Sequence, residues 1–342
     1  MSRRKWIQML VVTAVTACLL LFSGLLSAQG NSEQAFERVR EVQERNTAWL
    51  MALPGVVGTA IGEDESARPI VLLLLEHGAV AGIPPQLDGV LVRPLVTGKI
   101  VALQKGKPGG GSEPSPTSRW PRPVPIGVST GNANENSAGT IGCRVKDGSG
   151  NLYALSNNHV YARENNAASG EEVLQPGRYD GGKPGEDHLG NLSVYVPIVF
   201  STSAENTVDA AIALTTADLL RTSTPANGYG TPNSGTTVAS LNQKVQKYGR
   251  TTGLTKGSIN GINATVNVGY SSGTARFVNQ IIVYSRTSAF IKAGDSGSLL
   301  VTDNANNSPV GLLFAGDSSG KYGIANPIVP VLNAFGVTID GK

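Results

Sequence analysis

The stretch Gly-Asp-Ser-Gly-Ser at residues 294–298 places Ser296 between two glycines, and the chain then continues into an apolar segment at residues 298–301. Glycine has no Cβ, so the backbone can turn tightly here and aim the N–H groups of Gly294 and Ser296 at one point. A serine hydroxyl is a poor nucleophile unless a neighbouring imidazole accepts its proton. The stretch therefore predicts a nucleophilic serine beside a β-strand, served by a histidine and a carboxylate from elsewhere in the chain.

Two patterns earlier in the chain supply these groups. His159 ends the sequence Leu-Ser-Asn-Asn-His after an apolar segment, and Asp209 opens the apolar segment Asp-Ala-Ala-Ile-Ala. The order is His, Asp, Ser, with separations of 50 and 87 residues. His159 would serve as general base and then general acid, and Asp209 would hold the imidazole in one tautomer. Each residue alone is compatible with an ordinary loop or turn position, but together they predict a catalytic triad.

In this order, the three motifs resemble the chymotrypsin/trypsin-like serine peptidase family over about residues 125–342. The block Gly-Arg-Thr-Thr-Gly-Leu-Thr-Lys-Gly at residues 249–257 is similar to one in bacterial secreted members such as α-lytic protease and the streptogrisins. The resemblance implies an all-β fold of two six-stranded antiparallel β-barrels with the triad in the cleft between them. It also implies an endopeptidase that works through an acyl-enzyme and requires no cofactor.

The resemblance assigns further residues around the triad. The oxyanion hole falls to the backbone N–H groups of Gly294 and Ser296. Phe290 stands where members specific for Lys or Arg carry an acid, so that specificity is not expected, and an apolar or small side chain is the predicted preference. The substrate-binding positions are Phe290, Leu313, Phe314, Ala315 and Gly316, of which the last four form the edge that pairs with substrate.

The sequence departs from the family at three places near these motifs. Asn157 and Asn158 precede the histidine where small residues are usual, Val160 replaces a cysteine, and Ser298 replaces a glycine. None of these changes removes a catalytic group. A catalytically silent relative that binds a peptide or a partner protein remains the rival interpretation.

Residues 1–28 resemble an export signal, with three basic residues followed by a long apolar run. An uncleaved membrane anchor is the alternative, because the apolar run is about long enough to span a bilayer. Beyond residue 28 the chain has 25 basic and 25 acidic residues, which gives no electrostatic reason to bind nucleic acid or an anionic membrane. We therefore expect a secreted or periplasmic protein.

The rest of the chain divides into three parts. Residues 31–104 predict a small α+β domain, with a helix at 32–53 and strands at 56–61, 69–75 and 90–96. Residues 105–130 are rich in Pro, Gly and Ser and predict a linker. Residues 131–342 show many short apolar segments separated by turn residues, which is typical of an all-β domain. This last part is the predicted peptidase domain.

The order of signal, small domain, linker and peptidase domain favours a zymogen. The N-terminal domain would then be an intramolecular inhibitor or folding chaperone that is cut off in the linker, and a permanent accessory domain is the alternative. The expected partner is otherwise a polypeptide substrate. Cys143 is the one cysteine beyond the predicted signal, and its apolar neighbours predict that it lies in the core. The polar loop before His188 is predicted to be solvated and not to bind calcium, so we expect no metal site.

Overall fold

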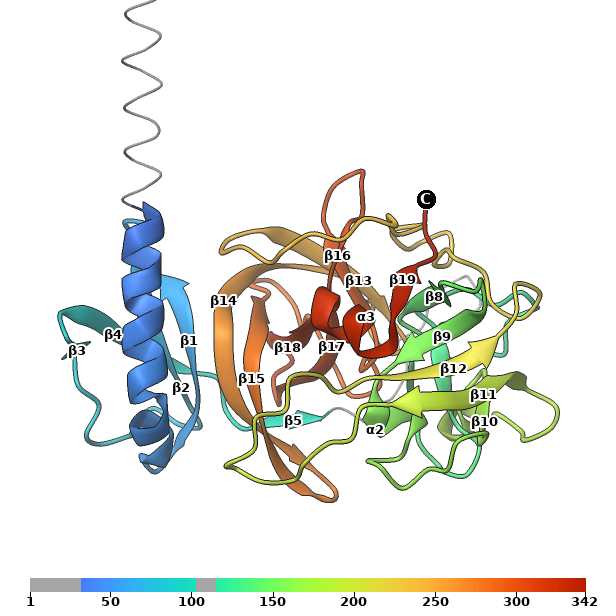
Figure 1. Ribbon diagram of the computed structural model, residues 1–342, viewed down its shortest axis with the longest axis horizontal. Helices are drawn as coiled ribbons and strands as arrows, with labels where there is room; N and C mark the ends of the chain where they lie inside the picture. The colour runs from blue at the N-terminus through green and yellow to red at the C-terminus, as the bar shows by residue number, and fades with distance from the viewer. Residues whose placement is uncertain (1–31, 103–114) are drawn as a thin grey trace, which may run out of the picture.

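The computed structural model describes residues 32–102 and 115–342 (Figure 1). A small N-terminal part, with its long helix, lies beside a larger body made almost entirely of strands. The larger body contains two sheets, and each is built around a core of its own. The all-β architecture expected for the greater part of the chain is confirmed.

The first sheet, called the first barrel below, forms the N-terminal half of the larger body. It has eight strands where six were expected, and no strand pairing among the described residues joins its two ends. Its strand order is β19-β8-β9-β12-β11-β10-β6-β7. Short strands separated by turn residues wrap it around a core that contains Cys143, Leu155 and Val173, all fully buried. The strands are β6 (Ser129–Asn132), β7 (Gly139–Thr140), β8 (Cys143–Asp147), β9 (Leu152–Ser156), β10 (Glu172–Leu174), β11 (His188–Tyr195), β12 (Ala211–Thr215) and β19 (Val337–Ile339).

The second sheet contains a closed ring of six strands. The ring runs β13-β16-β17-β18-β15-β14, and β14 pairs back onto β13 to close it. This is the six-stranded antiparallel barrel expected from the resemblance. Its strands are β13 (Lys244–Gly249), β14 (Gly253–Tyr270), β15 (Gly273–Tyr284), β16 (Leu299–Thr302), β17 (Pro309–Asp317) and β18 (Tyr322–Pro327).

The C-terminal segment ties the two barrels together. Helix α3 (Ile328–Phe335) follows β18 and buries Ile328, Val331 and Leu332, which are spaced to fall on one helical face. Gly336 ends the helix in the left-handed conformation, with φ of 63°. The chain then enters β19, which pairs with β8 of the first barrel.

The N-terminal part is a helix over residues 32–52 packed on a small sheet. Val39, Val42 and Leu50 of the helix share a core with Val71 and Leu73 of the sheet. The strands are β1 (Val56–Glu63), β2 (Pro69–Leu75), β3 (Gln86–Leu87) and β4 (Val90–Val96).

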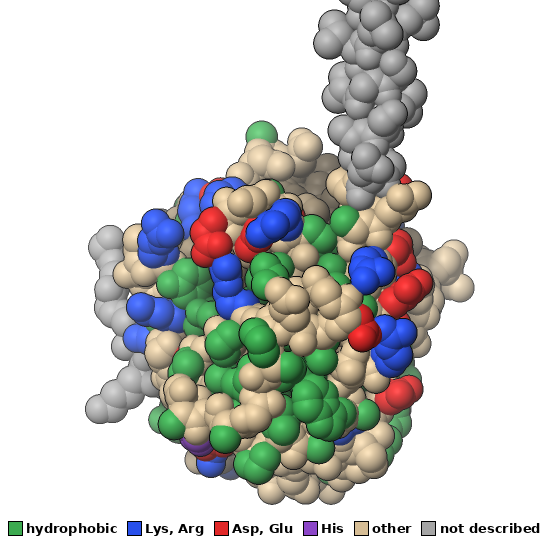
Figure 2. Space-filling view, turned by 90° about the vertical axis from the view of Figure 1, so that its left-hand side faces the viewer, with side chains coloured by type: hydrophobic (Ala, Val, Ile, Leu, Met, Phe, Trp, Pro, Cys, Tyr) green, Lys and Arg blue, Asp and Glu red, His purple; other side chains and the backbone are tan. Residues whose placement is uncertain are grey.

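This part also shares a sheet with the second barrel. Strand β1 pairs antiparallel with β14, with Gly58 opposite Val266 and Ile61 opposite Ile262, so the sheet continues from one part into the other. Figure 2 views the molecule from this side, where apolar side chains gather beneath a band of charged ones. Exposed apolar residues of the N-terminal part include Trp49, Leu91 and Val96.

The predicted linker extends less far than the sequence indicated. Its residues 105–114 lie outside the described residues. Residues 115–130, however, do not form a free connection, because Trp120, Val124 and Ile126 are buried in the core of the first barrel. The first barrel therefore begins before residue 131, and the expected boundary was wrong because isolated apolar residues among prolines hid a core-forming segment.

Two short helices connect strands of the first barrel. Helix α2 (Asn158–Tyr161) follows β9, and the 3₁₀-helix η1 (Arg178–Asp180) follows β10. Within residues 32–102 and 115–342, no helix combines the length and the apolar character needed to cross a membrane.

Candidate active site

His159 and Asp209 meet inside the first barrel. His159 lies in α2 at the end of β9, and Asp209 lies just before β12, the strand that pairs with β9. Nδ1 of His159 is 2.5 Å from Oδ2 of Asp209, and the backbone N–H of His159 donates to Oδ1 at 3.2 Å. Two bonds from one residue fix the direction of the imidazole relative to the carboxylate. This is the arrangement that selects the tautomer with the proton on Nδ1.

Ser296 lies in the loop before β16 of the second barrel. Its Oγ donates to the carbonyl oxygen of Phe314 on β17 at 3.1 Å. The next residue is also held to β17, because the N–H of Gly297 donates to the carbonyl oxygen of Leu313 at 2.8 Å. Gly294 has φ of 97°, and a Cβ there would lie 2.6 Å from Nη1 of Arg250, so the turn requires glycine.

Two glycines bring the serine loop against the histidine segment. A Cβ on Gly139 would lie 2.5 Å from Cγ2 of Val160 and 3.0 Å from the carbonyl oxygen of Ser296. A Cβ on Gly297 would lie 2.3 Å from Oγ of Ser156, three residues before His159. The chain therefore needs glycine at both positions to let the two barrels approach. The predicted triad residues are all fully buried.

The block at residues 249–257 holds the acid that precedes the serine. Oδ1 of Asp295 accepts hydrogen bonds from the N–H groups of Thr251 and Thr252 at 2.8 and 3.1 Å. Oδ2 accepts from the hydroxyl of Thr252 at 2.7 Å and from the N–H of Lys292 at 2.9 Å. The turn between β13 and β14 thus supports the loop that carries Ser296.

A lysine completes the surroundings of Asp295. Nζ of Lys247 on β13 lies 3.4 Å from Oδ2 of Asp295, and both side chains are fully buried. The same ammonium donates to the hydroxyl of Thr252 and to the carbonyl oxygen of Gly253. Burial lowers the pKa of Lys247, while the charge of Asp295 acts in the opposite direction.

Residues 124–128 are packed into the larger body. Val124, Ile126 and Val128 are fully buried, and the N–H of Gly127 donates to the carbonyl oxygen of Ile141 at 2.7 Å.

Arg250 joins the same loop to the first barrel. Its guanidinium is fully buried and pairs with Asp180 of η1 through Nε at 2.7 Å. Its backbone N–H donates to the hydroxyl of Thr140, which in turn donates to the carbonyl oxygen of Gly294 at 2.8 Å. The polar loop before His188 therefore contributes Asp180 to an ion pair between the barrels.

The two asparagines that depart from the family have defined contacts. Nδ2 of Asn157 donates to the carbonyl oxygen of Asp209 at 2.7 Å, which ties the histidine segment to the aspartate segment. Nδ2 of Asn158 donates to Oδ1 of Asn165 and to the carbonyl oxygen of Val196, both at 2.7 Å. Both side chains support the backbone around His159.

Tyr270 at the end of β14 was not singled out in the sequence. Its hydroxyl donates to Oδ2 of Asp209 at 2.9 Å, and its ring meets the ring of His159 edge-on with centroids 5.8 Å apart. Lys247 was missed as well. Neither lies in a recognisable motif, and both reach the site only through strand pairing, so no local signal marked them.

The predicted substrate positions divide into two groups. Phe290 and Leu313 lie in the core of the second barrel, and Phe314 packs on Phe277 with ring centroids 4.7 Å apart. Ala315 and Gly316 lie in the half of β17 that pairs with β5 (Ile100–Ala102). The second motif with an Asp-Ser pair, at residues 316–320, forms a turn in which Asp317 accepts the N–H of Tyr322 at 2.8 Å.

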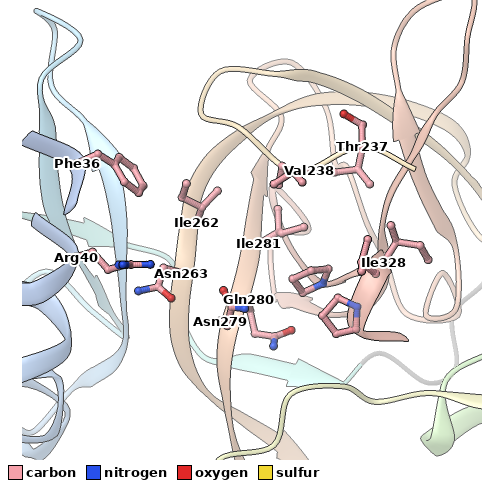
Figure 3. A pocket seen from close by; sticks show the side chains of 15 residues that line it. Phe36, Arg40, Thr237, Val238, Ile262, Asn263, Asn279, Gln280, Ile281 and Ile328 are labelled. Atoms are coloured by element: carbon pink, nitrogen blue, oxygen red, sulfur yellow. The ribbon is translucent and has the colours of Figure 1, made fainter. Parts of the chain in front are cut away.

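A groove of about 370 Å³ lies between the N-terminal helix and the second barrel (Figure 3). Phe36 and Arg40 of the helix face Ile262 and Asn263 of β14 across it. None of the predicted triad or substrate residues lines this groove.

The chain is similar to known proteins over part of its length. The family model of the Nal1 C-terminal domain matches residues 234–326. Streptogrisin-A of Streptomyces griseus is 38% identical over 106 residues, which cover 30% of this chain and 32% of that protein. The match thus spans about a third of that relative.

Two solved structures are similar to almost two thirds of the chain. Thermobifida fusca protease A is 22% identical, with a TM-score of 0.45, and the match covers 64% of this chain and 99% of that one. Nocardiopsis protease is 20% identical, with a TM-score of 0.44, and the match covers 63% and 98%. The stretch shared with streptogrisin-A makes this part of the chain similar to serine peptidases of the chymotrypsin/trypsin-like family, as the sequence motifs predicted.

Proposed function

We propose that this protein is an exported serine endopeptidase that acts through His159, Asp209 and Ser296. The observation that carries the proposal is the 2.5 Å contact between Nδ1 of His159 and Oδ2 of Asp209, on a segment packed against the loop of Ser296. A fixed imidazole beside a serine hydroxyl is the minimum apparatus for nucleophilic acyl transfer.

The proposed reaction uses these three groups in turn. Ser296 attacks the peptide carbonyl while Nε2 of His159 accepts the hydroxyl proton, and His159 then gives the proton to the leaving amine. The N–H groups of Gly294 and Ser296 would stabilise the oxyanion, and loss of one such donor typically costs about a hundredfold to a thousandfold in rate. Water then hydrolyses the acyl-enzyme by the same steps in reverse order.

We further propose that the N-terminal part inhibits the site in the same chain. Strand β5 pairs antiparallel with β17, with Ala102 opposite Ala315 and Val101 opposite Gly316. Ala315 directly follows Phe314, whose carbonyl oxygen accepts the Ser296 hydroxyl. The edge of β17 that the family resemblance assigns to substrate is thus occupied by the protein's own backbone, in strand β5. The full burial of the triad agrees with a precursor whose site is covered.

Labelling with a fluorophosphonate probe tests the catalytic proposal. We expect the reactive form to be labelled on Ser296 and expect Ser296→Ala and His159→Ala to abolish labelling. Ser318→Ala is the matched control, because Ser318 also follows an Asp in a Gly-flanked turn but lies outside the site. Labelling that survives Ser296→Ala, or no labelling of any form, would favour the silent binding module.

Weakening of β5 tests the inhibitory proposal. Val101→Pro removes a backbone N–H from the strand and should increase the rate of labelling of the intact chain. Val238→Pro, in a loop where this valine is 83% exposed, is the control and should leave the rate unchanged. An equal rate in wild type and Val101→Pro would exclude β5 as the block.

A further inference from the structure

The Asp209 carboxylate is shared between two donors on Oδ2. One is Nδ1 of His159 at 2.5 Å, and the other is the hydroxyl of Tyr270 at 2.9 Å. The two donors come from different barrels, since His159 follows β9 and Tyr270 ends β14. The charge on Oδ2 is therefore divided between the imidazole and a phenol that no motif identifies.

Aromatic contacts hold the side chain of Tyr270 in this position. The ring of Tyr270 contacts His159 edge-on, and it contacts Phe200 in the same manner on another side, with centroids 5.6 Å apart. Burial, followed by the charge of Asp209, raises the pKa of Tyr270 well above its ordinary value. The hydroxyl thus keeps its proton and stays a donor at physiological pH.

The turn after Tyr270 is fixed to the segment that carries the histidine. Oε1 of Glu164 accepts the hydroxyl of Ser271 at 2.7 Å, and Oε2 accepts the N–H of Ser272 at 2.7 Å. Glu164 lies five residues after His159. Burial opposes the ionisation of Glu164, but the hydrogen bonds from Ser272 and Ser271 outweigh it and lower its pKa.

The backbone that presents Glu164 has an unusual conformation. Arg163, Glu164 and Asn165 have φ of 51°, 55° and 74°, in the left-handed region that non-glycine residues seldom adopt. Strain of this kind persists only where the surroundings enforce it, and it gathers at functional sites. Here Asn158 enforces it by accepting the N–H of Asn165 at 3.1 Å.

We propose that Tyr270 is a positioning residue for the proposed reaction, and that Glu164 holds it in place by clasping the β14–β15 turn to the histidine segment. The Tyr270 hydroxyl sets how strongly Asp209 binds His159. The inference rests on the proposed function, but its consequence is a property of the His159–Asp209 contact and can be measured without turnover.

The test is the ¹H NMR signal of the proton between His159 and Asp209 in the intact chain. This proton is buried, and the chain has three histidines in all, so the signal is assigned by its loss in Asp209→Asn. Tyr270→Phe keeps the ring and removes the hydroxyl. Without its second donor the carboxylate becomes a stronger acceptor for Nδ1, and we expect the signal to move downfield.

The matched control is Tyr153→Phe. The hydroxyl of Tyr153 also donates to a carboxylate, Oδ2 of Asp147 at 3.0 Å, on the β8–β9 hairpin. It should leave the signal in place. An unmoved signal in Tyr270→Phe would overturn the proposal. An upfield shift would also overturn it, because it would mean that the hydroxyl strengthens the hydrogen bond between His159 and Asp209 instead of competing with it.

Two further measurements complete the test. Glu164→Gln, which keeps the shape of the side chain, should move the same signal in the same direction but by less, and no movement would remove Glu164 from the proposal. In a form that labels on Ser296, Tyr270→Phe should lower kcat by about tenfold with little change in KM. Labelled Ser296 with an unmoved proton signal would leave the peptidase proposal standing and reject this one.

Discussion

Lys247 and Asp295 place opposite charges 3.4 Å apart, and both side chains are fully buried. Asp295 is the residue before Ser296, so the ion pair lies directly behind the proposed nucleophile. The carboxylate also accepts hydrogen bonds from Thr251 and Thr252, and the lysine donates to Gly253. The conformation of the serine loop is thus set by contacts that exist before any cleavage of the chain.

We expect Lys247→Met to destabilise the protein by about 3–5 kcal/mol, because it leaves a buried carboxylate without its countercharge. Denaturant unfolding measures the effect. Lys256→Met is the control, since Lys256 pairs with Asp303 at an exposed position and should cost less than about 1 kcal/mol. Equal effects of the two substitutions would mean that the hydrogen bonds to Asp295 suffice without Lys247.

Gly249 is the position where β13 passes closest to the serine loop. A Cβ there would lie 2.5 Å from Oδ1 of Asp295 and 2.6 Å from Oγ of Ser298. Ser298 also donates to the carbonyl oxygen of Asp295 at 2.5 Å, so a displacement of either side chain would disturb the loop.

Gly249→Ala should therefore destabilise the protein by about 1–3 kcal/mol and slow the labelling of Ser296 at least tenfold. Gly148→Ala is the control, because a Cβ there meets no atom within 4 Å. Normal labelling of Gly249→Ala would show that the loop tolerates the displacement.

The sequence predicted the parts of the site that lie in local motifs. His159, Asp209 and Ser296 each stand next to a strand in a short pattern, and the family resemblance that these patterns carry predicted the two-barrel fold. The contact between Asp209 and Tyr270 spans 61 residues and depends on the length of β14, which apolar periodicity does not define.

The pairing of β5 with β17 was beyond sequence reasoning for a similar reason. A strand of three residues, Ile100–Ala102, gives almost no periodic signal, and its partner β17 lies more than 200 residues away. The N-terminal helix and the strands β2 and β4 were predicted well because their apolar patterns are long enough to be read from one segment.

Glu171 gives the stability of the histidine region a defined pH dependence. Burial raises the pKa of its carboxyl, but hydrogen bonds from Arg163, the N–H of Ala168 and Asn132 outweigh this and lower the pKa from 4.5 to about 2. A folded-state pKa below the unfolded one adds stability above pH 4.5 that is lost as the pH falls toward 2. The shift corresponds to about 3 kcal/mol.

We therefore expect Glu171→Gln to lower the free energy of unfolding by about 3 kcal/mol at pH 7 and by much less at pH 2.5. Denaturant unfolding at both pH values gives the comparison. Glu41→Gln, on an exposed position of the N-terminal helix, should have no effect at either pH. A Glu171→Gln deficit that stays constant from pH 7 to pH 2.5 would mean that the carboxylate charge is not the source of the stability.

In the proposed precursor, a cut that releases β5 would have to fall within a short part of the chain. Residues from Ser115 onward are held to the first barrel, since the carbonyl oxygen of Ser115 accepts Nε1 of Trp120 and the carbonyl oxygen of Pro116 accepts the N–H of Ser129 at 2.8 Å. A cut after residue 115 would break this packing, whereas a cut before residue 102 would leave part of β5 on the edge of β17.

We therefore expect the form that labels on Ser296 to begin between residues 103 and 115, as determined by intact mass and N-terminal sequencing of the exported protein. If the protein makes the cut itself, Ser296→Ala should stay full-length under the same conditions, while Ser318→Ala is processed normally. A labelled protein that still contains residues 32–102 in one chain would show that β5 leaves the edge of β17 without cleavage, and the N-terminal part would then be a permanent accessory domain.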